Sequence, residues 1–121
     1  MQQKKVFIFD DNVEILDLCT DILEDFDCEV KTSPTTNNLE EMLQDYMPDL
    51  IFMDNWIPDM SGIEATRLIK SNPELKQIPV IYFSANSNIK QLADEAGADD
   101  YIEKPFDIEM FEDTVKKHLN L

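Results

Sequence analysis

Residues 50–54 read Leu50-Ile51-Phe52-Met53-Asp54, four consecutive apolar residues followed by a carboxylate. Similar runs without polar alternation occur at Val6-Phe7-Ile8-Phe9 and Val80-Ile81-Tyr82-Phe83. Unbroken apolar runs of this length are typical of strands buried on both faces, as in a parallel sheet. Residues 29–32 and 101–103 are two weaker strand candidates.

Amphipathic helical patterns fill the segments between these runs, because apolar residues recur there at the i, i+3, i+4 and i+7 spacing of a helix. Ser61-x-x-Glu64 is predicted to be a capping box that opens the third helix, which should stop before Asn72-Pro73. Gly97 is predicted to close the fourth helix as its C-cap. The other four helices are predicted from apolar stripes at residues 15–26, 39–47, 89–96 and 108–119.

Strands and helices therefore alternate five times along the chain. Such alternation predicts an α/β fold, a doubly wound five-stranded parallel sheet with right-handed crossovers and helices on both faces. The chain has 121 residues, which suits one domain, and no linker, internal repeat or low-complexity segment interrupts it. We expect residues 1–121 to form a single domain.

Composition restricts the partners and the compartment. The formal net charge is −16, so the chain should repel nucleic acid and anionic membranes, and we expect neither as a direct partner. No signal peptide is visible and no run approaches the ~20 apolar residues of a membrane span, which predicts a cytoplasmic protein. The two cysteines indicate no disulfide framework, and the single His118, without a metal-ligand companion, is expected to be solvated.

The predicted sheet gathers polar residues at one edge. In a doubly wound sheet, sites form where the parallel strands end. Asp10-Asp11 follows the first strand, Asp54 the third, Ser84 the fourth and Lys104 the fifth. Taken singly, Asp10 or Asp11 could equally be the N-cap of the next helix, and Lys104 or Ser84 an ordinary surface or strand-end residue. Their joint occurrence at one edge favours a site.

The residue types at this edge indicate the chemistry. Clustered carboxylates repel one another unless a positive group lies among them. Mg²⁺ prefers such oxygen ligands, with Mn²⁺ as an alternative, and Lys104 supplies a further positive charge. This set suits phosphoryl transfer, in which positioning and charge neutralisation dominate. Because the chain has only Gly62 and Gly97, it cannot form a Gly-x-Gly-x-x-Gly or Walker loop. A phosphoryl acceptor must then be a side chain, and a carboxylate among cations is a feasible nucleophile.

At these residues the chain resembles the receiver domain of bacterial response regulators, the phosphoryl-accepting module of two-component signal transduction. The matching motifs are Asp10-Asp11, Asp54 to Pro58, Ser84-Ala85, and Gly97 to Phe106 with its Lys104-Pro105-Phe106 ending. Each motif is weak alone, but together they occur in family order over essentially the whole chain. The resemblance implies a flavodoxin-like receiver fold with strand order 2-1-3-4-5.

The resemblance also implies roles for individual residues. Asp54 would be the phosphoacceptor, and Asp11, Asp10, Asp54 and the backbone carbonyl of Trp56 would hold Mg²⁺. Ser84 and Lys104 would bind phosphoryl oxygens, and Tyr101 would be the aromatic switch residue. The Lys104-Pro105 peptide bond would often be cis in such a domain. The donor would be a histidine kinase or phosphotransfer protein, and residues 89–119 would form a face for a downstream target or for self-association.

Two other hypotheses remain open from the sequence. The first is a Mg²⁺-dependent phosphohydrolase that uses an aspartyl phosphate, although that class commonly has Asp-x-Asp after the first strand, where this chain has Asp10-Asp11-Asn12. The second is a degenerate receiver that serves only as a binding scaffold, against which the complete acceptor, metal and switch set argues. The leading hypothesis is a phosphorylation-controlled switch that catalyses its own phosphorylation and dephosphorylation and turns over no external substrate.

Overall fold

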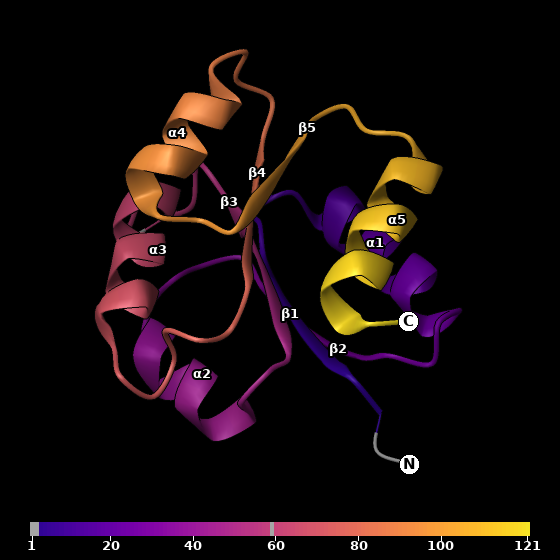
Figure 1. The fold of residues 1–121 in the computed structure, drawn as a ribbon, viewed down its shortest axis with the longest axis horizontal. Coiled ribbons are helices and arrows are strands. Elements are labelled where there is room, and N and C mark those ends of the chain that lie inside the picture. Colours follow the sequence, from indigo (N-terminus) through magenta and orange to yellow (C-terminus); the bar gives the residue numbers. More distant parts are fainter. Residues whose placement is uncertain (1–2, 59) are drawn as a thin grey trace.

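The computed structural model describes residues 3–58 and 60–121, in which five strands alternate with five helices (Figure 1). All strand pairs are parallel, and the strand order in the sheet is β2-β1-β3-β4-β5. The predicted doubly wound fold and its strand order are thereby confirmed. The elements are β1 (Lys5–Phe9), α1 (Val13–Glu24), β2 (Glu29–Ser33), α2 (Leu39–Tyr46), β3 (Leu50–Asp54), α3 (Gly62–Ser71), β4 (Val80–Ser84), α4 (Ile89–Ala96), β5 (Asp100–Glu103) and α5 (Ile108–Leu119).

The burial of each strand explains the strength of its sequence signal. Every residue of β3 and β4 is buried, as are the last four residues of β1, because these strands lie inside the sheet. β2 and β5 are the edge strands and are largely exposed, so their sequences carry polar residues and predicted them only weakly.

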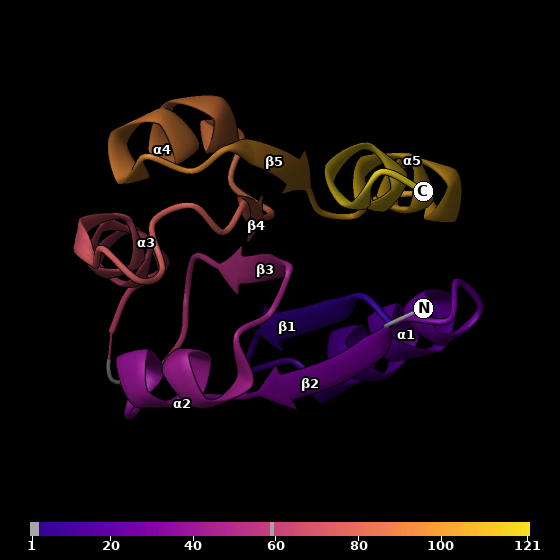
Figure 2. The same cartoon turned by 60° about the horizontal axis from the view of Figure 1, so that its bottom comes forward.

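Helices cover both faces of the sheet (Figure 2). On one face, α1 and α5 pack against alternate strand residues, and the ring of Phe111 stacks on Phe52 with centroids 5.0 Å apart. On the other face, α2 and α3 cover the opposite side chains of β1 and β3, and α4 covers Tyr82 of β4. Burial of these two apolar layers is the main stabilising contribution to the fold.

Helix ends follow the predicted signals in most places. The Ser61 hydroxyl accepts a hydrogen bond from the Glu64 amide at 3.2 Å, and Gly97 closes α4 with a φ of 83°. The end of α2 differs from the predicted stripe, since Met47 is its left-handed C-cap and is exposed. None of the helices in the described part of the chain is long and apolar enough to cross a membrane.

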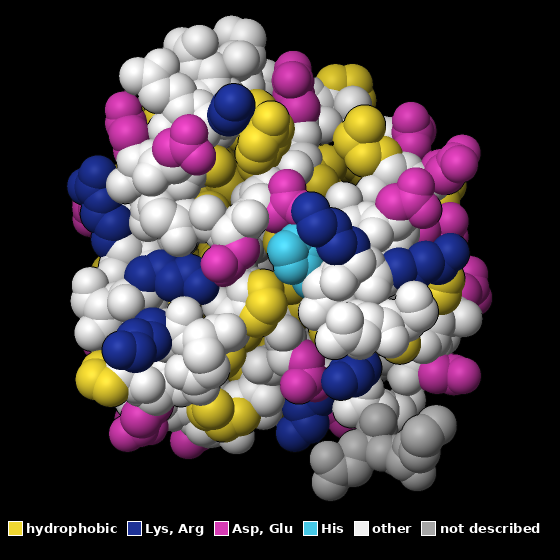
Figure 3. All heavy atoms as spheres, in the orientation of Figure 1, with side chains coloured by type: hydrophobic (Ala, Val, Ile, Leu, Met, Phe, Trp, Pro, Cys, Tyr) yellow, Lys and Arg dark blue, Asp and Glu magenta, His cyan; other side chains and the backbone are white. Residues whose placement is uncertain are grey.

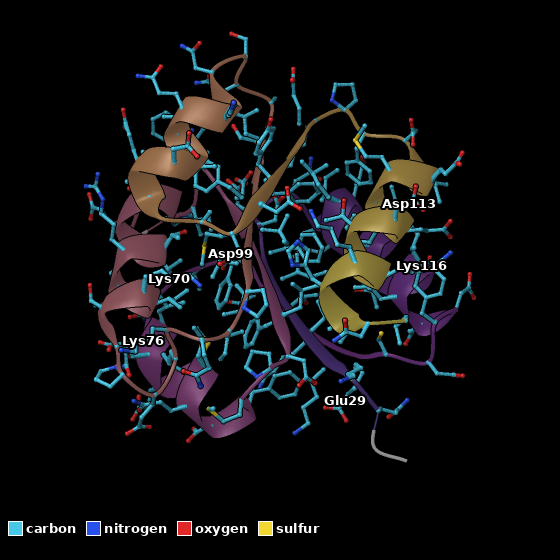
Figure 4. All side chains as sticks on the ribbon, in the orientation of Figure 1. Glu29, Lys70, Lys76, Asp99, Asp113 and Lys116 are labelled. Carbon is cyan, nitrogen blue, oxygen red and sulfur yellow. The ribbon has the colours of Figure 1, made fainter. Side chains whose placement is uncertain are left out.

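An ion pair closes the segment between α3 and β4. Lys70 and Asp99 point toward one another in Figure 4, and Lys70 Nζ lies 2.6 Å from Asp99 Oδ2. The same ammonium donates to the carbonyl of Ile78, and Asp99 Oδ2 also accepts a hydrogen bond from the Val80 amide. These bonds hold the start of β4, whose far end contributes to the site.

Candidate functional site

The acidic pair after β1 is held by the start of α1. The N-cap of α1 is Asn12, whose side-chain oxygen accepts hydrogen bonds from the Glu14 and Ile15 amides. Asp10 accepts a hydrogen bond from the Asn12 amide at 2.9 Å and is fully buried, whereas Asp11 is exposed. The alternative in which Asp10 or Asp11 caps the helix is therefore wrong, and both carboxylates are available to a site.

Three carboxylates meet at the carboxyl edge of the sheet. Oxygen atoms of Asp10, Asp11 and Asp54 all lie within 4.8 Å of one another. Two of the three residues are buried, so their mutual repulsion is only weakly screened by solvent. Hard oxygen donors at this separation fit a divalent cation such as Mg²⁺.

Lys104 connects two of these carboxylates. Its Nζ lies 2.6 Å from Asp10 Oδ2 and 2.7 Å from Asp54 Oδ1, and 4.6 Å from the ring centroid of Phe83. Its backbone amide donates to the Ser84 carbonyl at 2.8 Å, which continues the pairing of β4 with β5. The Lys104-Pro105 peptide bond is cis, as the resemblance implied.

The charges in this cluster perturb one another. Burial raises the pKa of Asp54, and the hydrogen bonds from Lys104 and the Trp56 amide offset only part of this effect. Burial also acts to lower the pKa of Lys104, but hydrogen bonds to Asp10 and Asp54 outweigh it and raise that pKa. Lys104 is therefore held as a cation between two carboxylates.

The remaining predicted residues surround this cluster at different distances. The backbone amide of Trp56 donates to Asp54 Oδ2 at 3.2 Å, while Trp56 as a whole is 76% exposed. Ser84 is buried at the end of β4, where its hydroxyl accepts a hydrogen bond from the Asn86 amide. Tyr101 lies on β5 and is partly exposed, paired across the sheet with Tyr82 rather than placed among the carboxylates.

Comparison with known proteins decides the family. The model of the response regulator receiver domain family matches residues 6–116. The chain belongs to the response regulator receiver family. It is 35% identical over 120 residues to the polar-differentiation response regulator DivK of Brucella anthropi, covering 96% of each chain. Receiver domains are signalling switches of two-component systems that bind Mg²⁺ at an acidic site and interact with histidine kinases and output domains.

Solved receiver structures agree with this assignment. The receiver domain of a signal transduction histidine kinase from Syntrophus aciditrophicus superposes with a TM-score of 0.88 at 28% identity, over 97% of this chain and 90% of that one. A putative response regulator from Chloroflexus aurantiacus has the same fold, with a TM-score of 0.92 at 22% identity over 99% of this chain and 100% of that chain.

Two further polar contacts, near the site and at the end of α5, were not predicted from the sequence. The buried Tyr82 hydroxyl donates to the side-chain oxygen of Asn55, next to Asp54. His118 Nε2 lies 2.9 Å from Asp100 Oδ2, and only 14% of the His118 side chain is exposed. The expectation that His118 is solvated is therefore wrong, because α5 places its last turn against the start of β5.

Proposed function

We propose that residues 1–121 form a single receiver domain that is controlled by phosphorylation of Asp54. The observation that supports this best is the cluster of Asp10, Asp11 and Asp54 within 4.8 Å of one another, with Lys104 bonded to two of them. Asp54 is the member that ends a central strand and accepts hydrogen bonds on both oxygens, which fixes its orientation.

Asp10, Asp11, Asp54 and the backbone carbonyl of Trp56 would hold Mg²⁺, with Mn²⁺ as a substitute. When bound, the cation neutralises charge on the phosphoryl oxygens and on the surrounding carboxylates. The three carboxylate donors fit this group because they are hard oxygen ligands from two neighbouring strand ends.

Each side chain of the site has a separate role in transfer of the phosphoryl group. A carboxylate oxygen of Asp54 attacks the phosphorus of a phosphohistidine, the P–N bond breaks, and the leaving imidazole takes up a proton. Lys104, now 2.7 Å from Asp54 Oδ1, pairs with the incoming phosphoryl oxygens. Ser84 donates a hydrogen bond from its hydroxyl to a phosphoryl oxygen, which draws the end of β4 toward the phosphorylated Asp54. Tyr101 responds to this movement and acts as the switch residue.

The donor would be a histidine kinase or a phosphotransfer protein, which docks over the carboxyl edge of the sheet. Exposed apolar side chains on the segments that follow β1, β3 and β5 support protein docking at this edge. These side chains are Val13, Trp56, Ile108 and Met110. The chain's net charge of −16 suits a partner with a basic patch and disfavours nucleic acid and membranes.

The output would pass through the face of residues 89–119 to a downstream protein target or to a second copy of the chain. Apolar side chains gather over β5 between α4 and α5 on the surface drawn in Figure 3, amid interspersed acidic and basic groups. We place this function in the cytoplasm, where histidine kinases present their phosphoryl groups. Membership of a signalling family supports a switch without an external turnover substrate over the alternative of a Mg²⁺-dependent phosphohydrolase.

Intact-mass measurement after incubation with acetyl phosphate and Mg²⁺ tests the proposal. The parent protein should gain one phosphoryl mass, and Asp54→Asn should gain none. Asp45→Asn is the matched control, since Asp45 is an exposed carboxylate on α2. An adduct that persists in Asp54→Asn would sink the assignment of the acceptor. Steady release of phosphate from a generic phosphate ester would instead favour the phosphohydrolase.

A further inference from the structure

Tyr82 combines an apolar environment with one polar contact to the site. It is fully buried in the middle of β4 and packs with Ile89, Ala93 and Ala96 of α4. Within this apolar cluster, its hydroxyl donates a hydrogen bond to the side-chain oxygen of Asn55. Asn55 is the residue between Asp54 and Trp56.

The packing of Tyr82 does not by itself call for a hydroxyl. A buried hydroxyl costs free energy unless it finds a partner, so phenylalanine would serve an apolar cluster at lower cost. Burial, and after it the charge of Asp54, raises the pKa of Tyr82 to about 12. The phenol is therefore a permanent hydrogen-bond donor at neutral pH, and Asn55 is the acceptor that compensates its burial.

Asn55 is held through both of its backbone polar groups and its side-chain oxygen. Its amide donates to the Phe83 carbonyl at 3.2 Å, and its carbonyl accepts a hydrogen bond from the Gly62 amide at 3.0 Å. The bond from Tyr82 adds the side chain. Because Asn55 shares peptide units with Asp54 and Trp56, restraining it limits the motion of both neighbours.

We propose that Tyr82 is a positioning residue that acts through Asn55 to hold the segment from Asp54 to Trp56 in the geometry that binds Mg²⁺. This inference rests on the proposed function, since it takes the Asp54 carboxylate and the Trp56 carbonyl as ligands. Tyr82 would act only through Asn55 and would itself ligate neither the cation nor the phosphoryl group. Tyr82 links the core under α4 to the end of β3 and the loop after it, which supply the Asp54 carboxylate and the Trp56 carbonyl.

A Mg²⁺ titration of the whole chain, followed by the emission of Trp56, tests the role of Tyr82. Trp56 is the single tryptophan and lies next to Asn55. Loss of a hydrogen bond to a metal ligand typically weakens metal affinity about 10- to 100-fold, and Tyr82 is one bond further away. We therefore expect Tyr82→Phe to raise the dissociation constant at least about threefold, and saturating Mg²⁺ to restore acceptance of a phosphoryl group from acetyl phosphate.

Asn55→Leu removes the other partner of the same bond. If the two side chains act as one unit, the double variant should lose no more Mg²⁺ affinity than whichever single variant loses more. Tyr46→Phe is the matched control, because the Tyr46 hydroxyl is also buried and its ring lies under the ammonium of Lys5, at the opposite end of β1 from the site. Tyr46→Phe should leave the dissociation constant unchanged.

The outcomes separate this inference from the proposed function. A parent protein whose emission and stability ignore Mg²⁺ would overturn both. If the parent binds Mg²⁺ and Tyr82→Phe binds it with the same dissociation constant, the role of Tyr82 alone is overturned. This holds even if the variant unfolds at a lower urea concentration than the parent. Additive losses in the double variant would also overturn it, since the two side chains would then act independently.

Discussion

Replacement of Gly62 by alanine should destabilise the protein, although the same change in a helix usually does the opposite. Gly62 begins α3, and its amide donates to the Asn55 carbonyl at 3.0 Å. A Cβ at this position would lie 2.2 Å from the carbonyl oxygen of Asp54 and 3.0 Å from the Asn55 Cα. Both obstacles are backbone atoms, so no side-chain rotation can relieve the contact.

Two opposing effects set the size of the change. Glycine to alanine within a helix ordinarily contributes about 1 kcal/mol of stability. Overpacking against atoms that cannot move aside typically costs about 1–3 kcal/mol, and here the obstacle is the end of a buried central strand. We expect the steric cost to exceed the gain, so Gly62→Ala should lower the free energy of unfolding by up to about 2 kcal/mol.

Urea unfolding followed by circular dichroism, without Mg²⁺, measures this difference. Ser71→Ala is the control in the same helix, because Ser71 is exposed and the change should stay within about 0.5 kcal/mol. Gly62→Ala should also weaken the Mg²⁺ response, since relief of the contact displaces the Asp54 backbone. A Gly62→Ala variant as stable as the parent or more stable would refute the close-approach argument.

Three further predictions concern the metal, the switch and the dependence on pH. Mg²⁺ at ten times its dissociation constant should stabilise the fold by about 1.4 kcal/mol and change Trp56 emission, and Asp11→Ala should remove both effects; a response that survives in Asp11→Ala would contradict this ligand. Ser84→Ala should still accept phosphate at Asp54 but lose most of the phosphorylation-induced shift of the Tyr101 ring protons, because a charge-assisted bond of about 1.5–3 kcal/mol biases the switch; an unchanged Tyr101 shift would mean that another group carries the coupling. Burial tends to raise the pKa of Asp100, but hydrogen bonds from His118 and the Tyr101 amide and the charge of Lys117 outweigh burial and lower that pKa. The stability that the Asp100 carboxylate contributes is therefore present above about pH 4 and is lost as the pH falls through its folded-state pKa. The difference in unfolding free energy between the parent and Asp100→Asn should shrink from pH 6 toward pH 3, and a constant difference would argue against the pairing of Asp100 with His118.

The sequence by itself determined the fold and which charged side chains meet at one edge of the sheet. Strands buried on both faces appear as unbroken apolar runs, and all parallel strands end at one edge of the sheet. Asp10, Asp11, Asp54 and Lys104 could therefore be placed together without coordinates, and the structure brings them together. The edge strands were less certain because solvent on their exposed sides removes the apolar signal.

Only the tertiary structure decided which polar groups bond to one another. Lys104 reaches Asp10 across 94 residues of chain and Asp54 across 50, and Tyr82 reaches Asn55 across 27. His118 finds Asp100 in the same way, although its sequence position predicted a solvated side chain. Apolar periodicity specifies which face of an element is buried, because burial is non-directional and averages over many residues. A hydrogen bond depends on the position of two particular atoms to within a few tenths of an ångström, and that precision arises only when the elements have packed.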